Sequence, residues 1–156
     1  MNGVSAHQMA EPPSLPDMTI SFQRSQLDQI ISHARDAAPR ECCGLVGGSD
    51  ARTQTVYPMR NVAADPLVTY EASPEDLFAA QRAMRERAEE LLAIYHSHPR
   101  SANPQPSETD VRLAYYPSAV YLIVGLGAEP PNIGVFRISE SAGSWESVEY
   151  EIVVDQ

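Results

Sequence analysis

The sequence predicts a mixed α/β fold in which a central β-sheet is flanked by helices. Apolar runs of strand length alternate with helical stripes in the order strand, helix, three strands, helix, strand, helix, three strands. Such a mixture is typical of helices packed on a sheet. The chain has 156 residues, of which 43% are hydrophobic and 21% charged, so it fits one domain with a buried core. We assign this domain to residues 18–156 and predict a disordered, proline-rich tail over residues 1–17.

The first elements are a strand, a helix and three further strands. Residues 18–22 open the first strand, and apolar side chains at i, i+3, i+4 and i+7 predict a helix that ends near Pro39. These side chains belong to Leu27, Ile30, Ile31 and Ala34. We place His33 on the solvent side of this helix. The three strands are expected over residues 41–48, 53–59 and 67–71.

A second helix is expected to begin at Ser73 and Pro74, because serine caps helix N-termini and proline fits the first turn. The apolar run over residues 91–95 is typical of a buried strand. The remaining elements are a helix over residues 107–116 and strands over residues 119–126, 133–138 and 145–154. The last strand alternates as a half-exposed hairpin strand does.

Charge and cysteine content restrict the function and the compartment. The net charge of −10 argues against nonspecific binding to nucleic acid or to an anionic membrane. Cys42 and Cys43 are adjacent and cannot form an ordinary disulfide staple. No signal peptide or run long enough to span a membrane is recognised, so we expect a cytoplasmic protein.

All eleven cationic residues are arginine, and the chain has no lysine. Composition bias of the genome explains this feature more simply than function does. A functional reason would be protection from lysine-directed conjugation.

Residues 96–110 carry the strongest sign of chemistry. His96 and His98 lie two apart at the end of a predicted strand, so their side chains share one face and form half of a zinc site. Pro99 turns the chain, and a helix begins near Ser107, so Asp110 returns as a third ligand. Taken singly, each part has a structural explanation, as surface histidines or as a helix-capping pattern.

The whole pattern reads His96-Ser97-His98-Pro99, seven residues, Ser107, two residues, Asp110. It resembles the signature of the JAMM (MPN-plus) metalloproteases, and Glu41-Cys42-Cys43-Gly44 resembles the upstream glutamate element of that family. The resemblance covers roughly residues 18–154 and implies the MPN fold, a cytidine-deaminase-like mixed sheet with flanking helices. Cys42 is an extra thiol that the family pattern does not explain.

The resemblance and the chemistry together imply a role for each residue. His96, His98 and Asp110 would hold one Zn²⁺ and leave a fourth position for water. Glu41 would be the general base, and Ser107 would donate to the developing oxyanion. Alternatives remain for the base: Glu41 could be an exposed acid before a strand, and Glu71 and Glu75 are rival carboxylates.

The resemblance also implies a substrate class. Members of the family cleave bonds after the Gly-Gly tail of ubiquitin-like proteins, and the short chain is most similar to the compact bacterial branch that acts on sulfur-carrier proteins. We expect release of cysteine from a carrier-cysteine adduct. A general bacterial JAMM deconjugase or peptidase and a noncatalytic MPN scaffold are the alternatives. The sequence leaves the oligomeric state open, a homodimer included.

Overall fold

Eight strands build one mixed sheet in the computed structural model, which describes residues 19–155. The strands are β1 (Ile20–Gln23), β2 (Cys43–Ser49), β3 (Arg52–Met59), β4 (Glu90–His98), β5 (Val120–Gly125), β6 (Asn132–Ser139), β7 (Ser144–Ser147) and β8 (Tyr150–Val153). The helices are α2 (Arg24–Ala37), α3 (Pro74–Glu86) and α4 (Glu108–Arg112). The strand order is β7-β6-β5-β4-β2-β3-β1-β8, so β4 and β2 lie near the centre. The predicted α/β class is confirmed.

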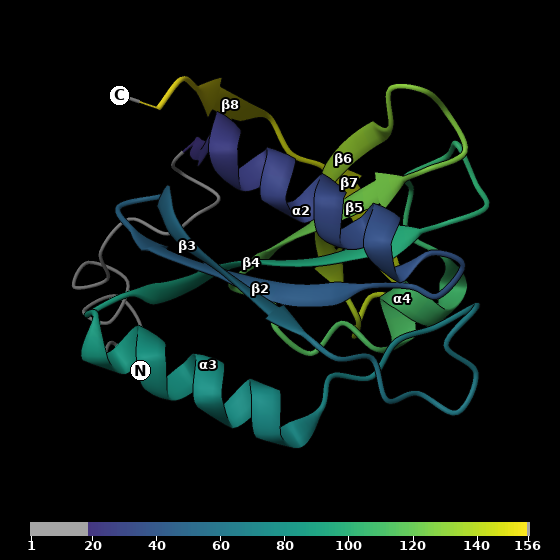
Figure 1. Cartoon of the computed structure of the whole chain (residues 1–156), viewed down its shortest axis with the longest axis horizontal. Coiled ribbons are helices and arrows are strands. Elements are labelled where there is room, and N and C mark those ends of the chain that lie inside the picture. The colour runs from purple at the N-terminus through teal and green to yellow at the C-terminus, as the bar shows by residue number, and fades with distance from the viewer. Residues whose placement is uncertain (1–18, 156) are drawn as a thin grey trace, which may run out of the picture.

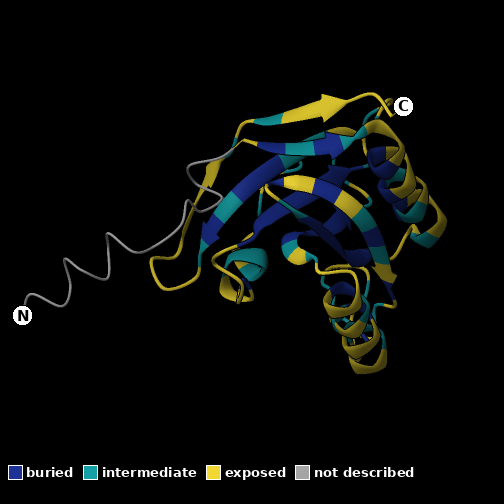
Figure 2. Cartoon of the chain, turned by 90° about the vertical axis from the view of Figure 1, so that its left-hand side faces the viewer, coloured by how far each residue is buried: buried dark blue, intermediate teal, exposed yellow. Residues whose placement is uncertain are grey.

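The helices cover opposite faces of this sheet. Helix α2 packs on one face through the predicted stripe, with Leu27, Ile30 and Ala34 buried, while α3 lies across the other face through Ala80 and Met84 (Figure 1). The strands between the helices are largely buried, and the outer sides of the helices are exposed (Figure 2). This arrangement gives the two hydrophobic layers that the amphipathic pattern requires.

The chain after β6 does not form one long strand. Only Val148 and Glu149 separate β7 from β8, yet these strands lie at opposite edges of the sheet. The N–H of Val148 donates to the carbonyl of Val135 over 2.8 Å, and the ring of Tyr150 meets Phe22 edge-on at a centroid distance of 5.9 Å. The predicted single strand over residues 145–154 is therefore wrong, because the chain crosses between the edges of a curled sheet.

Residues 67–71 form a loop instead of the predicted strand. The amides of Val68 and Thr69 donate back to the carbonyl of Asp65 at 3.3 and 3.2 Å, which produces a turn. The bridge between Asn61 and Ala72 closes the base of this loop. We call residues 62–71 the bridging loop.

Helix α4 is shorter than predicted, and His33 is less exposed. The helix ends at Arg112. The N–H of Tyr116 donates to the side-chain hydroxyl of Tyr121 and not to a backbone carbonyl four residues earlier, as it would in a helix. Nδ1 of His33 lies 2.7 Å from the hydroxyl of Tyr95, and burial lowers the pKa of His33 despite nearby Asp36. The interpretation of His33 as a solvated histidine was wrong.

Two predictions concern residues outside the range that the structure describes. The tail over residues 1–17 and the start of the first strand at Met18 lie outside residues 19–155. Within that range, none of the helices combines the length and the apolarity needed to cross a bilayer.

The start of α3 offers a test of the helix-capping interpretation. The hydroxyl oxygen of Ser73 accepts from the N–H of Asp76 over 3.4 Å and from the guanidinium of Arg60 over 3.0 Å. Ser73→Ala should lower the free energy of unfolding by about 1 kcal/mol, the usual cost of removing a cap. Urea denaturation measures this loss, and Ser73→Asp is the control that restores an acceptor. Equal stability of Ser73→Ala and wild type would contradict the assignment.

Candidate metal centre

Strand β4 carries the two histidines to the end of the sheet. Its partner β2 is antiparallel, and Cys43 lies opposite His96 in the register. Because residues two apart share a face, His96 and His98 point to the same side as Ile94, which packs in the core beneath α3. His96 is fully buried, and the His98 side chain is 13% exposed.

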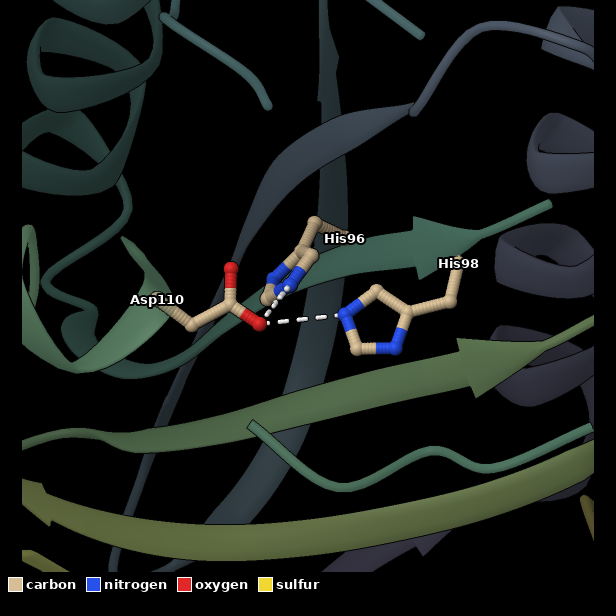
Figure 3. A group of neighbouring side chains, drawn as sticks. All are labelled: His96, His98 and Asp110. Carbon is tan, nitrogen blue, oxygen red and sulfur yellow. Dashed lines mark hydrogen bonds and ion pairs between the residues drawn. The ribbon is translucent and has the colours of Figure 1, made fainter. Parts of the chain in front are cut away.

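Helix α4 brings Asp110 to both histidines. Its side chain is 7% exposed, and Oδ2 lies 3.1 Å from Nε2 of His96 and 3.0 Å from Nε2 of His98 (Figure 3). The same oxygen accepts from the N–H of Ser107 over 2.9 Å, while the Ser107 hydroxyl accepts from the N–H of Asp110 over 3.0 Å. This reciprocal cap fixes Asp110 at the start of α4.

The facing atoms of the two histidines and Asp110 are better suited to binding a metal ion than to bonding one another. His96, His98 and Asp110 each offer a ligand atom, and these atoms lie within 4.8 Å of one another. Among the described residues, both ring nitrogens of buried His96 lack a hydrogen-bond partner, although Nε2 lies close to Asp110. A buried imidazole without partners is costly unless its lone pair binds a cation. Two imidazoles and a carboxylate are a donor set of catalytic zinc sites.

The ring nitrogen of His98 that points away from Asp110 makes a hydrogen bond that is common in metal-binding histidines. Its Nδ1 lies 3.2 Å from the carbonyl oxygen of Asn103, to which it donates, so in the neutral ring Nε2 carries the lone pair and faces Asp110. A histidine that ligates a metal commonly donates its other N–H to such a carbonyl. Asn103 was not identified from the sequence, because a backbone acceptor leaves no trace in side-chain type.

The carboxylate and the imidazole of His98 stabilise each other electrostatically. Burial acts to raise the pKa of Asp110, but its contacts with His96 and His98 outweigh burial and hold that pKa well below its usual range. Burial acts to lower the pKa of His98, and the contacts with Asp110 and the Asn103 carbonyl raise it overall. A bound divalent cation would take the place of the protons that this cluster attracts.

Glu41 is buried, which removes the alternative of an exposed acid before a strand. It is 5% exposed, and its Oε1 has no hydrogen-bond partner within residues 19–155. Continuing the register in which Cys43 opposes His96 places Glu41 beside His98, on the same face of the sheet. Burial, followed by the charge of Asp110, raises the pKa of Glu41 to about 7, while His98 partly offsets the rise. A carboxyl group with such a pKa suits proton transfer near neutrality.

The rival carboxylates lack these properties. The Glu75 side chain is 88% exposed and forms a 3.2 Å ion pair with Arg60. Glu71 is also exposed. Glu41 is therefore the acid best placed to serve the centre.

Ser107 and Ser97 differ in their exposure and in the groups that they contact. Ser107 is exposed, and accepting the N–H of Asp110 leaves its hydroxyl proton free to donate. Ser97 is fully buried, and its Oγ accepts from the N–H of Cys42 over 2.9 Å, which ties β4 to the residue after Glu41. Ser97 is thus structural.

The bridging loop lines two cavities, and none of the three candidate ligands lines either of them. The first has a volume of about 720 Å³ and is lined by Glu41, Cys42 and Val62 among others. The second, of about 660 Å³, is largely apolar and includes four tyrosines. One of them, Tyr70, stacks on His96 at a centroid distance of 4.7 Å and an interplanar angle of 28°. Tyr70 was missed because residues 67–71 read as a strand.

The chain matches a family model and several named relatives over most of its length. Residues 23–139 match the family model described as prokaryotic homologs of the JAB domain. The desampylase of Haloferax volcanii is 44% identical over 110 residues, which are 67% of this chain and 78% of that protein. The probable TtuB-protein conjugate cleaving protease of Thermus thermophilus is 33% identical over 73% of this chain and 75% of its own length. The CysO-cysteine peptidase of Mycobacterium tuberculosis is 34% identical over 63% of this chain and 67% of its own length.

Solved structures agree with this match. Protein DSY2949 from Desulfitobacterium hafniense superimposes with a TM-score of 0.74 and 31% identity, over 88% of this chain and 94% of that one. A JAB1/MPN domain protein from Archaeoglobus fulgidus shares the fold with a TM-score of 0.59 and 20% identity, over 86% of this chain and 98% of that one. The family match and the identity to named relatives agree with the shared fold, and the chain belongs to the JAMM (JAB/MPN) family of zinc metalloproteases, within its prokaryotic branch.

Proposed function

We propose that the protein hydrolyses the amide bond after the Gly-Gly terminus of a small ubiquitin-like or sulfur-carrier protein, and that cysteine is the amine released. One Zn²⁺ per chain would be held by His96, His98 and Asp110. The observation that carries the proposal is the convergence of three ligand atoms within 4.8 Å, beside a buried carboxylate. The named activities of the relatives support the substrate class.

Each of the proposed site residues would have a separate role in the reaction. Bound zinc would supply a Lewis acid and a water that loses its proton near pH 7. The Glu41 carboxylate would take the proton from the attacking water and return it to the departing amine. The Ser107 hydroxyl would donate to the carbonyl oxygen as that oxygen becomes negative. An extended Gly-Gly tail suits such a site because it can approach the ligands without side-chain clashes.

A second candidate is the cleavage of isopeptide bonds between a carrier and a protein lysine. The 44% identity to a desampylase favours it, and the catalytic groups would be the same. Only the leaving amine differs. The two cleavages are therefore tested on one carrier.

The test uses a Gly-Gly-ended carrier joined either to cysteine or to the lysine side chain of a protein. Mass spectrometry should show release of cysteine from the first substrate, with about one zinc per chain by elemental analysis. Faster cleavage of the second substrate would favour the deconjugase. Cleavage of neither substrate by zinc-loaded protein would overturn the proposal.

We also propose a cytoplasmic location, because Cys42 and Cys43 are free thiols and the cytosol keeps thiols reduced. Light scattering on the purified protein would distinguish a monomer from a homodimer.

Ser107 provides a test of the oxyanion role. Ser107→Ala should lower kcat about 100-fold, as loss of one oxyanion donor does, and should lower the free energy of unfolding by about 1 kcal/mol through loss of the cap. Zinc content should stay unchanged, because the Asp110 carboxylate accepts from the backbone N–H of position 107, which alanine keeps. Ser107→Thr is the control that keeps the hydroxyl. Wild-type kcat with reduced stability would show that Ser107 is a helix cap alone.

A further inference from the structure

The side chain of Asn61 makes four hydrogen bonds, all to backbone groups. Its Nδ2 donates to the carbonyls of Glu41 and Thr69, each over 3.0 Å. Its Oδ1 accepts from the N–H groups of Ala63 and Glu71, each over 3.0 Å. A side-chain amide has two donor hydrogens and two acceptor lone pairs, so its capacity is fully used.

These bonds connect the bridging loop to the backbone of Glu41. The N–H of Glu41 donates to the carbonyl of Pro66, within the loop, over 2.8 Å. The carbonyl of Glu41 accepts from Asn61, which also binds both ends of the loop. Glu41 precedes β2, so these contacts replace ladder bonds that a strand residue would have. The position of the Glu41 backbone therefore depends on the loop and on Asn61.

The bridging loop also reaches the rest of the site. Val62 and Leu67 line the cavity that contains Glu41. Ala63, Thr69 and Tyr70 line the tyrosine-rich cavity, and the Tyr70 ring stacks on His96. One loop thus contacts the base, a metal ligand and both cavities.

We propose that Asn61 is a positioning residue of the peptidase. It holds the bridging loop and the backbone of Glu41 in one arrangement, so that the carboxylate and the walls of both cavities keep a fixed place relative to the metal ligands. The role of Asn61 rests on Glu41 as the base and hence on the proposed function. The four hydrogen bonds of the Asn61 side chain go to backbone groups of residues outside the three proposed ligands.

Two substitutions at Asn61 separate its contacts. Asn61→Asp keeps the acceptors for Ala63 and Glu71 but loses both donors. Asn61→Ala removes all four bonds. The matched control is Gln26→Ala, because Gln26 is another buried side-chain amide, which bonds Thr53 at the far end of β3. Gln26→Ala should lower stability without changing kcat.

The measurements are zinc content, kcat and KM on the carrier-cysteine adduct and on the carrier-lysine isopeptide, and amide hydrogen exchange. Both Asn61 variants should keep their zinc and lose about tenfold or more in kcat, since small misplacements of a catalytic group cost this much. The Glu41 amide should exchange faster in both variants. The amides of Ala63 and Glu71 should stay protected in Asn61→Asp and lose protection in Asn61→Ala.

Two results would overturn the positioning role. One is wild-type kcat in both Asn61 variants, including the case in which only KM rises. The other is unchanged exchange of the Glu41 amide, which decides the question even if wild type cleaves neither substrate. If Asn61→Ala does not fold, Asn61→Asp alone carries the same two readouts.

Discussion

Asp110→Asn should abolish zinc binding and cleavage together. The substitution keeps the shape and the capping acceptor of the side chain but removes the charge that faces His96 and His98 at 3.1 and 3.0 Å. Loss of a partner outside the ligand set costs roughly 10–100-fold in metal affinity, so loss of a ligand should exceed about 100-fold. Competition with a chromophoric chelator measures the affinity, and the carrier-cysteine adduct reports activity.

Glu108→Gln is the matched control. Glu108 lies in the same first turn of α4, and its replacement by glutamine removes one negative charge, as Asp110→Asn does. It is exposed and should keep both zinc and activity. Full zinc affinity in Asp110→Asn would remove Asp110 from the ligand set and reduce it to a helix cap. A loss of helix α4 would not explain the loss of zinc, since the Ser107 cap is unchanged and the side-chain oxygen of asparagine can still accept the N–H of Ser107.

The three candidate metal ligands could be proposed from the sequence because their information is local. His96 and His98 lie two apart in β4, and Ser107 with Asp110 begins α4, so the period of a strand and the pattern of a cap place three ligands. Glu41 is 55 residues before His96, and no local pattern connects them. Its identification depended on a family resemblance, and its place beside His98 follows from the pairing of β2 with β4.

The bridging loop could not be predicted, because its structure depends on contacts between distant residues. Leu67, Val68 and Thr69 have strand-forming composition, but their chain bends at Asp65 and is held by Asn61. The split between β7 and β8 was missed for a similar reason. Val148, Tyr150 and Ile152 alternate with acidic residues, as in one strand, and such alternation does not record which sheet edge a strand joins.

Glu41→Gln should keep zinc and lose cleavage. A general base contributes typically 10²–10⁴-fold, so we expect kcat to fall by about 1,000-fold. None of the three proposed ligands is changed, and the neutral amide has nearly the same shape. Glu71→Gln and Glu75→Gln are the matched controls, since both rival acids are exposed, and they should keep wild-type kcat. Wild-type activity in Glu41→Gln would remove Glu41 from the reaction.

The same variant should be more stable than wild type when zinc is absent. The pKa of Glu41 rises from 4.5 to about 7 on folding, because burial disfavours its charged form. The folded state therefore binds this proton more tightly, and wild type loses stability as the pH rises from about 4.5 to about 7. Glutamine carries no such charge. At pH 8 the free energy of unfolding of the metal-free variant should exceed that of wild type by about 2 kcal/mol. This is less than the full pKa shift implies, because solvent from the adjoining cavity screens the charge.

Thermal unfolding with a chelator present measures this difference across the pH range. The gain in Tm should be largest at pH 8 and should shrink toward zero near pH 4. Zinc should abolish it, because a nearby cation stabilises the carboxylate and lowers its pKa. A gain that does not vary with pH would mean that packing, and not a buried charge, distinguishes the two side chains. A gain that grows with pH and disappears with zinc would place the Glu41 carboxylate within the field of the metal, where the proposed proton transfer requires it to be.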